Sequence, residues 1–173
     1  AFSVAAAASG AAQVTSVDVS PGYTDWNRAN FSANRLNPKK HRFLVGDCMA
    51  KLAELAELAE LAELASSKEQ FDIILMDPPS FSTTAKGRFT TRGGTSDLVA
   101  ACLPLLADGG LLICSSNHQK TDLADYLKEL RRGALQAKAE LRVIEQKGQP
   151  VDFPFTVTLP EGRYLKYLVC VKG

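Results

Sequence analysis

The stretch DIILMDPPSFS, residues 72–82, joins an apolar run to an acidic residue, two prolines and an aromatic residue. The run predicts a buried strand over Phe71–Met76 that ends at Asp77. Pro78 restricts Asp77 to extended geometry, and the prolines offer carbonyl acceptors but no N–H donors. Such an edge suits a planar ring with an exocyclic amine, on which Phe81 could stack. The alternative is a rigid turn after a strand, with Phe81 in the core.

Strands and helices are predicted to alternate on both sides of this stretch. The predicted strands are Val14–Val19, Phe43–Val45, Phe71–Met76, Leu111–Ser115, Leu141–Gln146 and Tyr164–Val171. The predicted helices are Tyr23–Leu36 after a start at Ser20-Pro21, a long helix after Asp47, Asp97–Leu106 before a turn at Asp108–Gly110, and one that begins at Thr121 as N-cap. This alternation predicts an α/β fold with a doubly wound, mostly parallel sheet. The last connection lacks an obvious helix, so the last strand is expected to be antiparallel.

An Ala-Glu-Leu repeat fills Ala53–Ala65 with strong helix formers. A period of three drifts by about 60° per repeat against the helical 3.6, so the leucines should spiral around the helix rather than form one stripe. One interpretation is a connecting helix lengthened by repeat expansion, and the other is a helix that binds a partner.

Composition bounds the class of protein. A chain of 173 residues is long enough for one domain with a real core, and residues 1–173 are expected to form a single catalytic domain. The formal net charge of +1 gives no general attraction to nucleic acid. Four cysteines without a CxxC pair, and two histidines, argue against a metal site or a disulfide scaffold. No apolar run reaches the roughly 20 residues of a membrane span, and the Ala-rich start lacks the basic region of a signal peptide. A cytoplasmic protein is expected.

Acidic residues follow three predicted strands in succession. These are Asp18, Asp47 and Asp77, and Ser115–Asn117 follow the next strand. Ligands of open α/β sheets bind outside the carboxyl ends of the strands, where a carboxylate commonly takes the ribose hydroxyls of a nucleotide-like cofactor. Asp47 could accept a hydrogen bond from an adenine amine. The alternative for each of Asp18 and Asp47 is an N-cap of the following helix.

Five segments in order resemble the class I S-adenosylmethionine-dependent methyltransferases, in particular the bacterial large-subunit rRNA methyltransferase group that includes cytosine carbon-5 enzymes. They are TSVDVS (15–20), RFLVGD (42–47), FDIILMDPPSF (71–81), LADGGLLICSSN (106–117) and LPEGRYLKYLVCV (159–171). They cover nearly the whole chain, and DPPSF and PEGRYLK are the most specific.

The resemblance implies S-adenosylmethionine as cofactor, ribosomal RNA as partner and no metal. It implies cofactor contacts at Asp18, Val19, Ser20, Asp47, Cys48 and Asp77, and a target base bordered by Asp77, Pro78, Pro79 and Phe81. Substrate contacts are predicted at Ser116 and Asn117. The basic connector with Lys86, Arg88 and Arg92 is interpreted either as a mobile loop that grips phosphates or as a solvated surface loop.

The chain departs from the family pattern at its start. The family's opening strand and its glycine-containing cofactor loop are absent, and Ala1–Val4 looks like the helix that follows that loop. The sequence is therefore expected to lack the N-terminal part of the catalytic domain, and with it the first strand of the sheet.

A second departure concerns the nucleophile. Carbon-5 methylation of cytosine needs a thiolate that adds to the ring, yet Cys114 lies about two residues before the position where such enzymes carry it. Cys114 is interpreted as a core residue, and the Ser115–Asn117 run resembles enzymes that methylate a ring nitrogen such as guanine N7. The predicted function is methylation of a base in ribosomal RNA. The alternatives are a methyltransferase for another substrate and a catalytically silent domain that binds RNA or protein.

Overall fold

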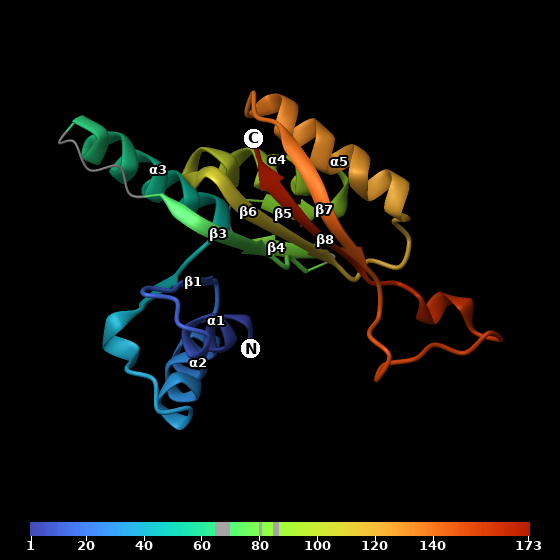
Figure 1. The fold of residues 1–173 in the computed structure, drawn as a ribbon, viewed down its shortest axis with the longest axis horizontal. Coiled ribbons are helices and arrows are strands. Elements are labelled where there is room, and N and C mark those ends of the chain that lie inside the picture. Colours follow the sequence, from blue (N-terminus) through green and yellow to red (C-terminus); the bar gives the residue numbers. More distant parts are fainter. Residues whose placement is uncertain (65–69, 80, 85–86) are drawn as a thin grey trace. The chain divides into compact units, whose positions relative to one another are not determined.

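The computed structural model describes residues 1–64, 70–79, 81–84 and 87–173. They divide into two compact units, Ala1–Leu55 and Ala56–Gly173, and each unit is described by itself (Figure 1). The expectation of one domain over residues 1–173 stays a prediction.

The first unit contains a pair of parallel strands and the helices around it. Its elements are α1 (Phe2–Ala8), β1 (Thr15–Asp18), α2 (Pro21–Ala33), the 3-10 helix η1 (Pro38–Lys40), β2 (Arg42–Val45) and the start of α3 (Cys48–Leu64). The strands pair in parallel, with Asp18 opposite Val45. Ser20 caps α2 as predicted, because its hydroxyl accepts a hydrogen bond from the Tyr23 N–H at 3.3 Å.

Aromatic packing makes the core of this unit. Phe31 of α2 is fully buried, and its ring centre lies 4.8 Å from that of His41 and 5.1 Å from that of Phe43. His41 also accepts a hydrogen bond at Nδ1 from the Val14 N–H, at 3.1 Å. These contacts fasten α2 to the residues that lead into β1 and β2.

The Ala-Glu-Leu repeat lies in α3. Leu52 and Leu55 are buried, whereas Leu58 is 57% exposed. The leucines thus move off one face within two repeats, which confirms the drift predicted from the period of three.

The second unit is built on a four-stranded sheet with the order β3-β6-β8-β7. Its elements are β3 (Phe71–Met76), β4 (Phe81–Thr84), β5 (Gly87–Thr90), α4 (Thr91–Cys102), η2 (Leu103–Leu105), β6 (Leu106–Ser116), α5 (Leu123–Gln136), β7 (Leu141–Lys147), η3 (Pro160–Gly162) and β8 (Lys166–Lys172). Strands β3 and β6 are parallel, and β8 runs antiparallel to both β6 and β7. The antiparallel last strand is therefore confirmed.

Helices α4 and α5 pack closely in this unit. A Cβ atom added at Gly133 of α5 would lie 2.5 Å from the carbonyl oxygen of Ser96 and 2.6 Å from Cβ of Val99, both in α4. The absence of a side chain at Gly133 is what lets the two helices approach. The buried side chains of β6 and β8 include Leu112, Cys114, Leu168 and Cys170.

Three helices have bounds other than the predicted ones, and the first is α2, which spans Pro21–Ala33 rather than Tyr23–Leu36. Helix α4 begins at Thr91 rather than Asp97, and its last residue is Cys102 because a 3-10 turn leads straight into β6. The N-cap of α5 is Asp122 rather than Thr121, since the Asp122 carboxylate accepts from the Asp125 N–H at 2.7 Å.

Two predicted loops are also different. In the described part of the basic region, β4 and β5 pair antiparallel, with Phe81 opposite Thr90. The predicted turn at Asp108–Gly110 lies inside β6 as an irregularity: Phe71 pairs with Leu106, but Ile73 pairs with Leu111. Gly109, at φ +75°, takes the left-handed backbone that the detour requires.

Candidate functional site

The carboxyl ends of β1 and β2 bring Asp18 and Asp47 to one edge of the first unit. The strands are parallel and in register, and the Gly46 N–H donates to the Asp18 carbonyl at 2.9 Å. Asp47 follows directly. The structure therefore places these two predicted cofactor residues on neighbouring strand ends.

Each of these carboxylates uses one oxygen locally. Oδ1 of Asp18 accepts from the Ser20 N–H at 2.8 Å, and Oδ1 of Asp47 accepts from the Ala50 N–H at 3.1 Å. The N-cap interpretation of Asp47 is thus confirmed. Among the residues that the structure describes, the second oxygen of each carboxylate has no hydrogen-bond donor, so the pair fits a group that presents hydroxyl and amine donors, such as the nucleoside part of a cofactor.

The other predicted cofactor residues of this unit lie at the same strand ends. Val19 is 63% exposed, Ser20 is occupied as the cap of α2, and Cys48 is the exposed first residue of α3.

Asp77 lies at a matching edge of the second unit. Met76, the last residue of β3, pairs with Cys114 of β6, so Asp77 follows at the level of Ser115. Asp77 and Pro79 are exposed and Pro78 is half-buried. The acceptor-rich edge predicted from the sequence is therefore accessible on this unit.

The end of β6 is a buried polar stretch. Ser115 and Ser116 are each 6% exposed, whereas Asn117 is exposed. The phenol of Tyr126 in α5 donates to the Ser115 carbonyl at 3.2 Å. Burial, with smaller contributions from nearby sulfurs and Asp77, raises the pKa of Tyr126 far above its ordinary value. Its hydroxyl is therefore a fixed donor at neutral pH.

Cys114 is a core residue, as predicted. Its side chain is fully buried, and a hydrogen bond with Cys170 and burial together raise the pKa of its thiol well above the usual range. A protonated, enclosed thiol is a poor nucleophile.

Lys166, which belongs to the PEGRYLK segment, and Tyr126, which the sequence did not single out, also reach this end of β6. Lys166, the first residue of β8, pairs with Ser116, and its ammonium donates to the carbonyls of His118 at 2.6 Å and Tyr164 at 2.7 Å. Nothing in the sequence indicates that Tyr126 reaches the Ser115 carbonyl.

The structure does not describe the side chains of several predicted site residues. The backbone of Phe81 lies in β4, that of Arg88 in β5 and that of Arg92 in α4, without described side chains. Lys86 lies outside the described residues.

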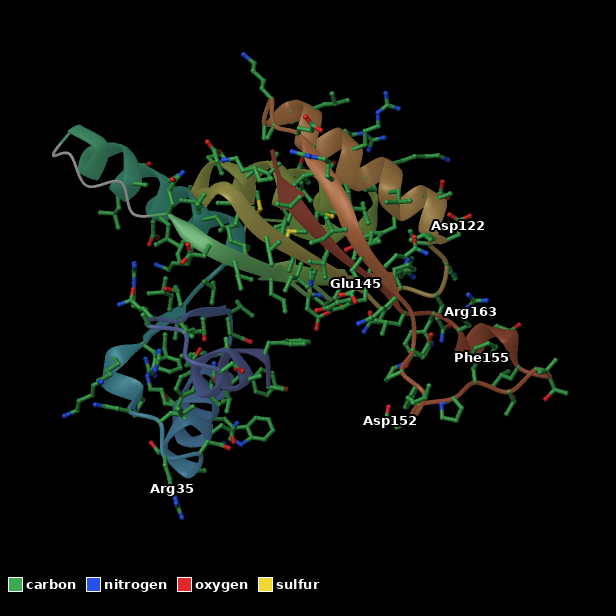
Figure 2. The ribbon with its side chains drawn as sticks, in the orientation of Figure 1. Arg35, Asp122, Glu145, Asp152, Phe155 and Arg163 are labelled. Atoms are coloured by element: carbon green, nitrogen blue, oxygen red, sulfur yellow. The ribbon has the colours of Figure 1, made fainter. Side chains whose placement is uncertain are left out.

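The connection between β7 and β8 carries Phe155 and Arg163, which lie near each other in Figure 2. The guanidinium carbon of Arg163 is 5.9 Å from the centre of the Phe155 ring. Arg163 thus has a cation–π partner on its own segment.

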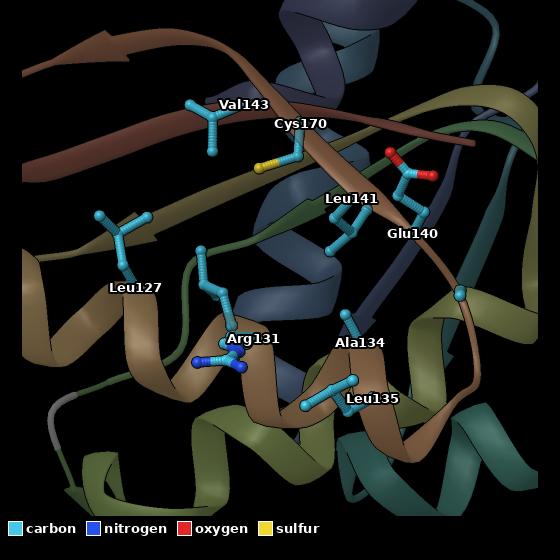
Figure 3. Close-up of a pocket in the computed structure, with 10 residues that line it drawn as sticks. Leu127, Arg131, Ala134, Leu135, Glu140, Leu141, Val143 and Cys170 are labelled. Carbon is cyan, nitrogen blue, oxygen red and sulfur yellow. The ribbon is translucent and has the colours of Figure 1, made fainter.

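A hollow of about 290 Å³ lies elsewhere in the second unit, between α5 and β7 (Figure 3). Its lining includes Leu130, Ala134 and Val143, and it contains none of the predicted site residues.

Metal ligands do not gather in threes among the residues that the structure describes. In the same residues, no helix combines the length and apolar character that a bilayer crossing requires.

Comparison with known proteins identifies the family. The model of the S-adenosylmethionine-dependent methyltransferases matches residues 1–165. Ribosomal RNA large subunit methyltransferase I of Serratia proteamaculans is 34% identical over 98% of this chain and 41% of its own. Ribosomal RNA large subunit methyltransferase K/L of Dichelobacter nodosus is 39% identical over 72% of this chain and 16% of its own.

The fold agrees with solved structures. A methyltransferase crystallised with SAH superposes with a TM-score of 0.84 at 29% identity, over 98% of this chain and 42% of that one. The chain belongs to the S-adenosylmethionine-dependent methyltransferase family, which confirms the predicted family and α/β fold class. It spans about two fifths of the length of the Serratia relative.

Proposed function

We propose that this protein transfers a methyl group from S-adenosylmethionine to a base of large-subunit ribosomal RNA. The observation that carries the proposal is the match to a relative named for that activity, at 34% identity over 98% of the chain. The strand-end carboxylates of both units support it, because they lie where the fold binds ligands. An rRNA substrate places the protein in the cytoplasm.

In this proposal the first unit holds the nucleoside part of the cofactor. Ribose hydroxyls donate to the second oxygen of Asp18, and the adenine amine donates toward Asp47, with Cys48 beside it. Val19 and Ser20 border the ribose. When bound, S-adenosylmethionine supplies a methyl carbon made electrophilic by the sulfonium.

Asp77, Pro78 and Pro79 receive the target base. Their carboxylate and carbonyl oxygens accept hydrogen bonds from an exocyclic amine, and Phe81 stacks on the ring. Asp77 is also proposed as a cofactor contact. Ser116 and Asn117 contact the base from the end of β6. Lys86 and Arg88 bind phosphates of the RNA.

A ring nitrogen is the atom that this site favours. Bound S-adenosylmethionine would supply the methyl carbon to the nitrogen lone pair, and its sulfur would keep the electron pair of the bond that breaks. No thiolate is needed, because positioning and a polar environment suffice for such a transfer. The supporting observation is that Cys114 is fully buried and its thiol pKa is raised.

The test is methyl transfer by the purified full-length protein to unmodified rRNA, with calorimetry of S-adenosylhomocysteine binding beside it. Asp77→Asn should lower the transfer rate at least about tenfold. Asp72→Asn, an exposed carboxylate earlier on β3, is the matched control and should leave it unchanged.

Cofactor binding without any RNA methylation would instead support a methyltransferase for another substrate. Absence of cofactor binding would support a silent domain that binds RNA or protein.

A further inference from the structure

The turn that leaves β6 is held by contacts within itself. The Ser116 hydroxyl accepts from the His118 N–H at 3.4 Å, and Nδ1 of His118 lies 2.7 Å from the Thr121 hydroxyl. These short-range bonds set the local shape of the chain around Asn117, the exposed residue at the centre of the turn.

Two side chains from other elements hold the carbonyls on either side of Ser116 and Asn117. Tyr126 of α5 donates to the Ser115 carbonyl before them, and Lys166 of β8 donates to the His118 carbonyl after them. Side chains of α5 and β8 thus hold the backbone on both sides of the dipeptide Ser116–Asn117. Such support from outside a segment is how a binding residue is held in one geometry.

Burial of the Lys166 ammonium costs desolvation free energy. The residue is only 7% exposed, and burial lowers the pKa of its ammonium, with Asp122 acting in the opposite direction. Among the described residues its ammonium forms no ion pair within 4.0 Å, and its recorded acceptors are the carbonyls of His118 and Tyr164. A buried ammonium with carbonyl partners is weak support for stability, since an apolar side chain of similar size avoids the desolvation.

We propose that Lys166, together with Tyr126, is a positioning residue that fixes Ser116 and Asn117 against the target base. The inference rests on the proposed function, because it assigns to these two residues the contact with the substrate. In this proposal Lys166 acts through the His118 carbonyl and not by direct contact with the base or the cofactor.

The chain contains a matched control at the other end of the same strands. Lys172 of β8 donates to the Leu106 carbonyl of β6 at 2.7 Å and pairs with Asp108 at 3.1 Å. Lys172 is therefore a second lysine-to-carbonyl link between β8 and β6, remote from the Ser116 end. If Lys166 had a structural role alone, its replacement would lower stability without slowing methyl transfer in the folded protein more than replacement of Lys172 does.

The experiment compares Lys166→Met, Tyr126→Phe and Lys172→Met in the purified full-length protein. Single-turnover methyl transfer to rRNA should slow about tenfold or more in Lys166→Met and about threefold or more in Tyr126→Phe, because small misplacements of reacting groups are costly. Lys172→Met should keep the wild-type rate. Affinity for S-adenosylhomocysteine should stay within about twofold in all three.

Hydrogen exchange supplies a readout that needs no activity. Amides of residues 116–119 should exchange at least about tenfold faster in Lys166→Met than in Lys172→Met. Unchanged exchange in this segment, equal rate losses for the two lysine variants, or a loss of cofactor affinity in Lys166→Met alone would each overturn the positioning role. If the wild-type protein methylates no RNA while the exchange difference holds, the proposed function fails and the role of Lys166 in fixing the turn stands.

Discussion

Asp18→Asn separates the two hydrogen-bonding roles of a single side chain. Oδ1 of Asp18 accepts from the Ser20 N–H at 2.8 Å, and an asparagine oxygen can accept the same bond. The substitution therefore preserves the local turn before α2. What it removes is the negative charge and the second carboxylate oxygen, the group that we assign to the cofactor ribose.

The expected magnitude follows from the loss of one charge-assisted hydrogen bond. Such a bond contributes about 1.5–3 kcal/mol, and 1.4 kcal/mol corresponds to a tenfold change in Kd. Asp18→Asn should thus weaken S-adenosylhomocysteine binding by about 10- to 150-fold in calorimetry, with an unchanged melting temperature.

Asp25→Asn is the matched control for this measurement. Asp25 is an exposed carboxylate of α2 in the same unit, paired with Arg28 at 2.7 Å, and its loss should change Kd by less than about twofold. An Asp18→Asn protein that melts normally and binds within about twofold of wild type would refute the assignment of the ribose to Asp18.

Three further substitutions test the second unit. Gly133→Ala should lower the free energy of unfolding by about 1–3 kcal/mol in denaturant titration, because the new methyl group meets α4 at 2.5 Å. The control is Gly22→Ala, where the nearest atom is 3.8 Å away and the effect should be neutral or slightly stabilising. Equal effects of the two substitutions would contradict the close approach of α4 and α5. Above about pH 10 the phenol of Tyr126 ionises in the unfolded chain but not in the folded one, since its pKa is raised on folding, so the free energy of unfolding should fall with rising pH by up to about 1.4 kcal/mol per unit. Tyr126→Phe should lose this contribution, and a wild-type slope in the variant would rule out the buried phenol. Cys114→Ala should retain methyl transfer, and loss of transfer with unchanged cofactor affinity would restore Cys114 as a nucleophile.

Sequence reasoning worked where one strong local signal stood alone. The strand Phe71–Met76 was predicted with its observed bounds, because an apolar run meets Pro78 and Pro79 immediately after Asp77. It was less accurate where adjacent residues compete. Thr121 and Asp122 can both cap a helix, and the structure uses Asp122 for α5 while Thr121 contacts His118.

Other features depend on contacts that no local pattern encodes. The Thr91–Ser96 segment contains two glycines and carries no helical periodicity, so the true start of α4 was missed. From the sequence alone, Gly133 is expected only to weaken its helix, whereas the structure shows that a side chain there would collide with Val99 of α4. The Lys166 bond to the His118 carbonyl spans 48 residues and the Tyr126 bond to the Ser115 carbonyl spans 11, and no local sequence pattern indicates either bond.

The central claim, methylation of a base in large-subunit rRNA, is tested most directly by nucleoside mass spectrometry. Ribosomal RNA from a strain that lacks the protein is compared with RNA from the same strain complemented by the wild-type or Asp77→Asn protein. We expect one ring-nitrogen-methylated base to disappear from the rRNA, to return with the wild-type protein and not to return fully with Asp77→Asn. An rRNA methylation profile that is identical with and without the protein would contradict it.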